Sequence, residues 1–190
     1  AWVSVAGIYG NVVLKAVMTG GATEDFALSL YYPVMKNEEW KMTSTSSSVA
    51  PDWNSVAFTG SDWADVVLGT NTAAVMGTQY FRKDFDGISG MAAYELELHY
   101  QYGIVAYVNG VEVYRDHMPD GAVTAATPSN GAFEAYEYHG VIIPASEIEG
   151  DNNVLAVELH FPDVTSENAV AFVAYVASLA PSTHDAESCY

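Results

Sequence analysis

Hydrophobic and polar residues alternate along several short stretches of this chain. In "YELELHYQY" the apolar side chains share one face, namely those of Tyr94, Leu96, Leu98 and Tyr100. A repeat of two residues is typical of a β-strand that buries one face. The same repeat in "VLAVELHF" predicts a second such strand, with Glu158 and His160 on its outward face.

The stretch "YVNGVEVYRDHMPDG" (107–121) predicts a β-hairpin. Asn109 and Gly110 both tolerate positive φ, which a two-residue type I′ turn requires. With this turn Ile104 lies opposite Arg115, so the apolar face of the hairpin would end at the arginine. The Met-Pro-Asp-Gly segment at 118–121 would then turn the chain away.

The remaining pattern is also that of short strands. The run "AVAFVAYVASL" (169–179) is apolar on both faces and predicts a central strand, whereas helix signals are limited to one turn at 144–150. Many antiparallel strands without βαβ alternation predict an all-β jelly-roll β-sandwich. We expect residues 36–180 to form it, with an extension of two or three strands at 1–35 and a polar tail or linker at 181–190.

The charge balance narrows the possible partners. The 190 residues include 6 Lys+Arg and 24 Asp+Glu, a net charge of −18. Nucleic acids and anionic lipid surfaces require basic patches, so we expect neither as a partner. The apolar N-terminal run is interrupted by Asn11 and Lys15, so no membrane span is predicted there. Strong acidity suits a secreted or cell-surface protein, a calcium-rich setting or high salt, and it also serves solubility alone.

Several motifs in order resemble a galactose-binding-like β-sandwich module. They are "PDWNSVAFTGSDWADVVLG" (51–69), "TQYFRKDF" (78–85), "GIVAYVNGVEVYRDHMPDG" (103–121) and "GDNNVLAVELHF" (150–161), and the resemblance covers residues 38–180. It implies a non-catalytic jelly-roll module of a large extracellular or cell-surface protein, often attached to a hydrolase. Some relatives bind sugars, and many hold a structural Ca²⁺. This chain departs from the family at Gln101-Tyr102, where two aspartates are usual.

Signatures of catalysis are absent from the sequence. It contains no Gly-x-Ser-x-Gly, His-Glu-x-x-His or Cys-x-x-Cys motif, so we expect no enzyme and no required cofactor. The stretch "DFDG" (84–87) places Asp84 and Asp86 before a glycine, which is a fragment of a Ca²⁺ loop. It predicts either a structural Ca²⁺ site or an acidic turn at the end of a strand.

A short polar cluster follows the hairpin. The candidates for ligand binding are Arg115, Asp116, His117 and Asp120. In this interpretation Arg115 binds a carboxylate or a sugar hydroxyl. The alternative is structural, with Arg115 pairing with a nearby acid and pinning the turn at 118–121. A partly buried arginine is costly unless it is paired, and acids are in excess, so the residues favour the structural alternative.

The two ends of the chain supply candidate contacts with other proteins. Trp2, Tyr31 and Tyr32 lie in the N-terminal extension, and Cys189 is a candidate for an interchain disulfide. Residues 1–35 are suited to adding a strand to this sandwich or to a neighbouring subunit. We therefore expect a non-catalytic extracellular building block of a homo-assembly, filamentous if strands are exchanged. The alternatives are a carbohydrate-binding module that recognises glycans and an accessory domain of a secreted hydrolase.

Overall fold

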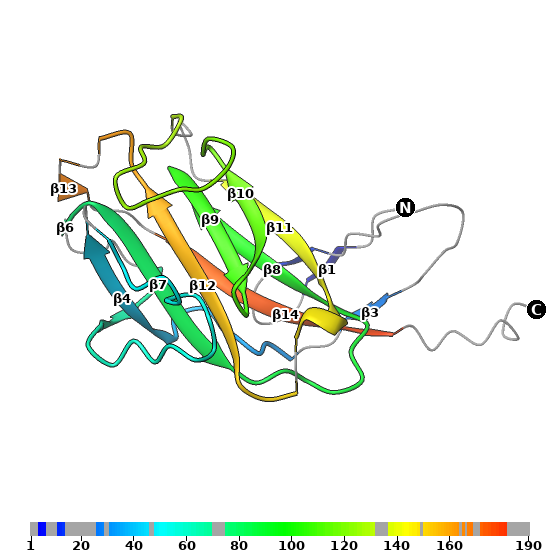
Figure 1. Ribbon diagram of the computed structural model, residues 1–190. Coiled ribbons are helices and arrows are strands. Elements are labelled where there is room, and N and C mark those ends of the chain that lie inside the picture. Colours follow the sequence, from blue (N-terminus) through cyan, green and yellow to red (C-terminus); the bar gives the residue numbers. More distant parts are fainter. Residues whose placement is uncertain are drawn as a thin grey trace, which may run out of the picture.

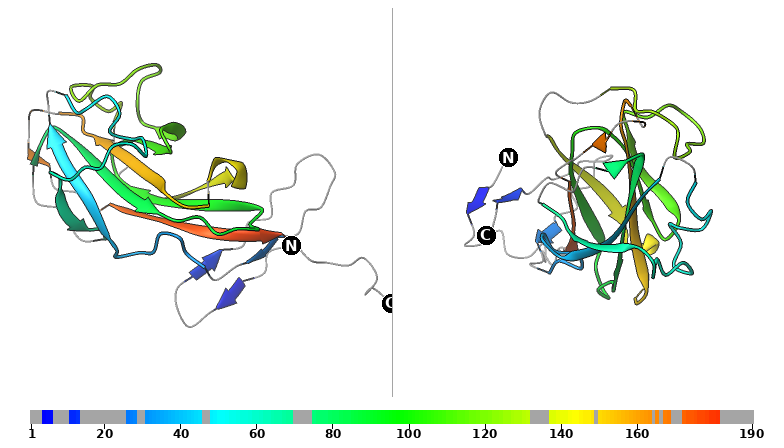
Figure 2. Two further views of the ribbon diagram at one scale, coloured as in Figure 1. Left: turned by 60° about the horizontal axis from the view of Figure 1, so that its bottom comes forward. Right: turned by 90° about the vertical axis from the view of Figure 1, so that its left-hand side faces the viewer.

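Two antiparallel β-sheets face each other in the computed structural model of the chain (Figure 1). The structure describes residues 4–6, 11–13, 26–28, 31–45, 48–69, 75–131, 137–148, 150–163, 165, 167–168 and 172–181. The six-stranded sheet has the order β10 (Val111–Asp116), β9 (Gly103–Val108), β12 (Asn153–His160), β7 (Thr78–Phe85), β4 (Glu39–Thr45) and β5 (Ala64–Val67). The four-stranded sheet has the order β11 (Glu137–Pro144), β8 (Ala93–Tyr100), β14 (Val173–Pro181) and β3 (Phe26–Leu28). The predicted all-β antiparallel sandwich is confirmed, and its layers are also visible from the end (Figure 2).

Two short strand pairs and one helical turn complete the described part of the chain. β1 (Ser4–Ala6) pairs with β2 (Asn11–Val13), and β6 (Val75–Met76) pairs with β13 (Glu167–Asn168). The only helix among the described residues is a single 3₁₀ turn, η1 (Ala145–Glu147), which lies where one helical turn was predicted.

The hydrophobic core lies between the two sheets. The alternation predicted for β8 is confirmed, because its four inward side chains are at most 2% exposed: Tyr94, Leu96, Leu98 and Tyr100. From the other sheet β12 contributes Leu155, Val157 and Leu159, which are also buried. The predicted central strand is β14, which pairs with β8 on one side and β3 on the other.

The opposite face of the six-stranded sheet is also covered. Glu158 and His160 point away from the core, yet they are only 4% and 0% exposed. They lie on the outward face of the strand, as predicted, but this face is covered and not open to solvent. The segments after β4 and after β10 fold over this face. Their residues Trp53 and Ala125 form a second apolar cluster with Tyr80, Val154 and Ala156 of the sheet.

Arg82 of β7 anchors the first of these covering segments. Its side chain is 2% exposed, and its Nη1 donates to the carbonyl oxygens of Trp53 (3.0 Å) and Ser55 (2.7 Å). Nη2 donates to Asp84 Oδ1 at 2.9 Å. Buried charge is costly unless it is hydrogen-bonded, so these three acceptors are what permit an arginine here.

The hairpin forms with the predicted turn but with a different register. Asn109 and Gly110 take φ values of 51° and 84°, as the turn requires. A β-bulge between Glu112 and Tyr114 then shifts the pairing, so that Arg115 lies opposite Val105. The predicted pairing of Arg115 with Ile104 is wrong, because one extra residue moves each later side chain to the other face.

Part of the N-terminal extension belongs to the sandwich. β3 forms the edge of the four-stranded sheet, with Leu28 opposite Leu179. Val34 is fully buried and forms a bridge with Val176, and the Tyr31 carbonyl oxygen accepts a hydrogen bond from the Ser178 backbone at 3.1 Å. Of the two alternatives for this segment, the described residues show addition to its own sheet.

At Gly103, β9 lies very close to the segment after β10. A Cβ atom on Gly103 would lie against Met118 Sδ, 2.6 Å from Ser129 Cβ and 3.0 Å from the carbonyl oxygen of His117. We expect Gly103→Ala to lower the free energy of unfolding by about 1–3 kcal/mol, the usual cost of overpacking. Urea denaturation followed by tryptophan fluorescence measures the change.

The matched control is Gly150→Ala, because a Cβ atom there meets nothing within 4 Å. We expect it to change stability by less than about 0.5 kcal/mol, as is usual for surface positions. Equal stability of the two variants would contradict the close approach at Gly103.

Candidate functional site

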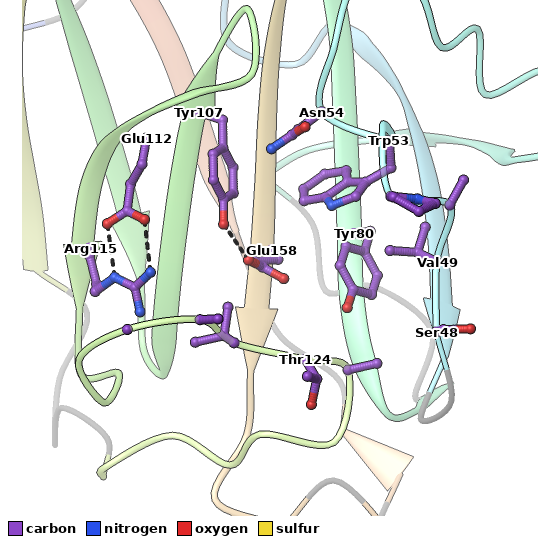
Figure 3. A pocket seen from close by; sticks show the side chains of 16 residues that line it. Ser48, Val49, Trp53, Asn54, Tyr80, Tyr107, Glu112, Arg115, Thr124 and Glu158 are labelled. Carbon is purple, nitrogen blue, oxygen red and sulfur yellow. Dashed lines mark hydrogen bonds and ion pairs between the residues drawn. The ribbon is translucent and has the colours of Figure 1, made fainter.

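A pocket of about 540 Å³ opens on the outer face of the six-stranded sheet. Figure 3 shows its lining side chains, which come from β7, β9, β10 and β12 and from the two covering segments. Those with aromatic or charged groups are Trp53, Tyr80, Tyr107, Glu112, Arg115 and Glu158. Its volume lies within the range of ordinary small-molecule sites.

Three aromatic rings belong to the apolar part of the pocket. The ring of Trp53 meets that of Tyr80 edge-on at 4.9 Å between centroids, and that of Tyr107 at 5.6 Å. Trp63 stacks against Trp53 at 6.2 Å. Because Trp53 is only 6% exposed, its position is set by packing and by the hydrogen bond from Arg82 to its carbonyl oxygen.

Glu158 brings a buried carboxylate to the same pocket. The Tyr107 hydroxyl donates to Glu158 Oε1 at 2.6 Å, and Glu158 Oε2 lies 3.2 Å from His160 Nε2. Burial, together with the negative charge of Glu158, raises the pKa of Tyr107. The phenol therefore stays protonated and keeps the carboxylate in one orientation.

His160 connects this carboxylate to the loop that covers it. Its Nδ1 lies 2.8 Å from the carbonyl oxygen of Thr127 and 3.2 Å from Thr78 Oγ1. A carbonyl oxygen only accepts, so Nδ1 carries the hydrogen and Nε2 is the nitrogen that faces Glu158. Thr78 Oγ1 also donates to the Ala125 carbonyl oxygen at 2.9 Å, which ties the pocket rim to β7.

Arg115 lines the pocket through a two-pronged ion pair with Glu112. Nε and Nη2 each donate to a different Glu112 carboxylate oxygen at 2.8 Å, and Nη1 donates to the Pro119 carbonyl oxygen at 2.8 Å. Residues three apart in a regular strand point to opposite faces, so the bulge is what makes this pair possible. The contacts with an acid and with the 118–121 turn are those of the structural alternative for Arg115.

The other members of the predicted polar cluster lie elsewhere. Asp116 is on the core side of β10, where its carboxylate accepts from the Tyr100 hydroxyl at 2.7 Å and from the His117 backbone at 2.8 Å. His117 has a φ of 50° and Asp120 is exposed. Of the four predicted residues, only Arg115 lines the pocket.

The aspartates of the predicted Ca²⁺ loop have other partners in the structure. Asp84 Oδ1 accepts from Arg82, and Asp86 Oδ1 accepts from the Asn152 backbone at 3.2 Å. No group of three or more His, Cys, Asp or Glu side chains suited to a metal occurs among the described residues. Binding of Ca²⁺ stays a prediction.

The candidate contacts at the chain ends are only partly described. Trp2 and Cys189 lie outside the described residues. Tyr31 is 68% exposed, and the ring of Tyr32 lies 6.2 Å from that of Tyr175. In the part of the chain that the structure describes, no helix has the length and apolar character needed to cross a membrane.

Sequence reasoning missed most of the pocket. Tyr107 and Glu158 were assigned to strands, but nothing in their spacing indicates that two distant loops enclose them. The aromatic-rich segment around Trp53 is the available signal in the sequence, and Trp53 itself is buried by packing.

Comparison with solved structures shows the same fold inside larger enzymes. The chain is similar to a glycosyl hydrolase family 2 member from Bacteroides cellulosilyticus, with 14% identity, a TM-score of 0.53 and coverage of 75% of this chain and 20% of that one. It is also similar to a β-glucuronidase from Ruminococcus gnavus in complex with D-glucuronic acid, with 11% identity, a TM-score of 0.52 and coverage of 80% and 30%. The chain thus spans between a fifth and a third of these proteins. No protein-family model matches it, and a search of curated proteins finds no match.

The Glu112–Arg115 pair makes a testable contribution to stability. Hydrogen bonds from Arg115 lower the pKa of Glu112 below its ordinary value of 4.5. A carboxyl group with a lowered pKa stabilises the fold above its ordinary pKa, and the effect is lost as the pH falls through the folded-state value. We expect Glu112→Gln to cost less than about 1 kcal/mol at pH 7, because the pair is partly exposed.

The cost of Glu112→Gln should decline below pH 4.5 and vanish once the carboxyl is protonated in the folded protein as well. Urea denaturation at a series of pH values measures it. Glu147→Gln, at an exposed site in η1, makes the same change in charge and serves as the control. A cost independent of pH would contradict the ion pair.

Proposed function

We propose that this chain is a non-catalytic saccharide-binding module, an accessory β-sandwich domain of a larger carbohydrate-active protein. The observation that carries the proposal is the pocket in which a buried carboxylate, oriented by a tyrosine hydroxyl, lies beside aromatic rings. An extracellular or cell-surface location accords with the strong acidity of the chain.

The chemistry of the pocket matches the chemistry of a sugar. Sugar hydroxyls donate hydrogen bonds, and Glu158 offers carboxylate oxygens that accept them. Sugar C–H groups pack on aromatic rings, which Trp53, Tyr80 and Tyr107 supply. These groups stand on strands or are fixed by Arg82, so they are in place before a ligand arrives, which lowers the cost of binding.

The structural neighbours support the wider context. They are a glycosyl hydrolase family 2 member and a β-glucuronidase, and this chain corresponds to a portion of each rather than to the whole. The likeness is one of fold, so the link to carbohydrate rests on the pocket. No constellation for catalysis was found in the sequence, which supports a binding role for this portion.

Blocking the pocket tests the proposal directly. A glycan array identifies the ligand, and isothermal titration calorimetry measures its affinity. Ala122 is exposed and lines the pocket, so the ring of Ala122→Phe would occupy space the sugar needs. We expect affinity to fall by at least about tenfold, which corresponds to about 1.4 kcal/mol.

The matched control is Ala126→Phe, an exposed position of the same segment that does not line the pocket. It should keep wild-type affinity within about twofold, because surface changes away from a site have small effects. Equal binding by both variants would place the saccharide elsewhere, and an array without any binder would exclude the proposed function.

A second candidate function is a building block of a homo-assembly. It is favoured by the short edge strand β3, which pairs with β14 through three residues, and by the exposed side chains of Tyr31 and Met35, at 68% and 53%. A short edge strand is the kind of element that two copies can exchange.

Light scattering coupled to size-exclusion chromatography separates this candidate from the first. An assembling chain should elute as a dimer or larger, and deletion of residues 1–28, which removes β3, should return a monomer. A monomeric wild-type chain at all concentrations would exclude self-assembly without affecting the saccharide site.

A further inference from the structure

The charges of the pocket indicate which saccharides it accepts. We propose that the pocket binds neutral sugars and discriminates against acidic ones such as uronic acids, an inference that rests on the proposed saccharide site. One structural neighbour is a β-glucuronidase in complex with D-glucuronic acid, whereas the pocket of this chain has the wrong charges for such a ligand.

The cationic side chain of the pocket already has hydrogen-bond partners within the protein. Among the described residues that line it, Arg115 is the one with a positive charge. Its three nitrogens donate to both oxygens of Glu112 and to the Pro119 carbonyl oxygen, each at 2.8 Å. A ligand carboxylate would have to displace Glu112 from a two-pronged contact, which is among the strongest pairings of an arginine.

The nearby Arg82 is not available either. Its guanidinium donates to the carbonyl oxygens of Trp53 and Ser55 and to Asp84, and it does not line the pocket. Removing it from these acceptors would release the segment that carries Trp53. No described cation is therefore free to receive an acidic sugar at this site.

The pocket also carries negative charge of its own. Glu158 is 4% exposed, and a second carboxylate beside it would be repelled strongly, since charges are poorly screened in a buried site. His160, with Nε2 3.2 Å from Glu158 Oε2, can at most neutralise it. Glu112 and Arg115 cancel each other's charge. The net charge of these two side chains together with Glu158 and His160 is therefore zero or negative and never positive.

The same groups suit a neutral sugar. A carboxylate has about four acceptor positions, and Glu158 uses one for Tyr107 and directs one oxygen toward His160. The remaining positions accept hydrogen bonds from sugar hydroxyls. Binding a hydroxyl in this way buries no additional charge. Binding an unpaired ligand carboxylate would bury one, which is energetically costly.

Matched sugars that differ only at C6 test the inference. The probes are methyl β-D-glucoside and methyl β-D-glucuronide, with the corresponding galactoside and galacturonide, each titrated into the intact chain by calorimetry and by NMR. We expect a neutral member to bind at least about tenfold tighter than its acidic partner at low ionic strength, and the ratio to shrink as salt screens the repulsion.

Glu158→Gln removes the charge and keeps an oxygen that accepts from Tyr107, so the ratio should fall below about threefold. Glu147→Gln, with the same charge change at an exposed site in η1, should keep the wild-type ratio. A uronide that binds wild type as tightly as its neutral partner would overturn the selectivity and leave the saccharide site intact. Absence of binding by all probes and by the whole array would overturn the site itself and this inference with it.

Discussion

The buried guanidinium of Arg82 is the interaction on which the pocket depends. It lies on the outer face of β7 and donates to the carbonyl oxygens of Trp53 and Ser55, residues 29 and 27 positions away in the sequence. These bonds hold the segment after β4 against the sheet and place the ring of Trp53 over Tyr80 and Tyr107. Without a cover the outer face of β12 would be solvent-exposed, and Glu158 would be an ordinary surface carboxylate.

The β-bulge after Glu112 is the second constraint. It moves Arg115 to the face of Glu112 and moves Asp116 to the core side, beside the Tyr100 hydroxyl. One irregular residue thereby creates the ion pair at the pocket rim and links β10 to the turn at Pro119. Bulges that re-aim side chains near binding sites are a recurrent use of this irregularity.

The electrostatics of the site agree with those of the whole chain. A net charge of −18 produces a field that disfavours the approach of anions at low ionic strength. Inside the pocket the charge of Glu158 also disfavours anions. Burial is the main cause of the raised pKa of Tyr80 and Tyr107, and the charge of Glu158 is the second cause. The surface and the pocket therefore select against the same class of ligand.

The sequence by itself determined the elements whose causes are local. Side-chain alternation identified the buried face of β8, and the Asn109-Gly110 pair identified the hairpin turn, because a period of two and a positive φ depend on neighbouring residues alone. Tertiary structure decided the rest. The burial of Glu158 depends on the covering loops, and the bulge decides that Arg115 faces the pocket while Asp116 faces the core. The bonds that hold those loops, such as those from Arg82, join residues far apart in the chain, so no local pattern specifies them.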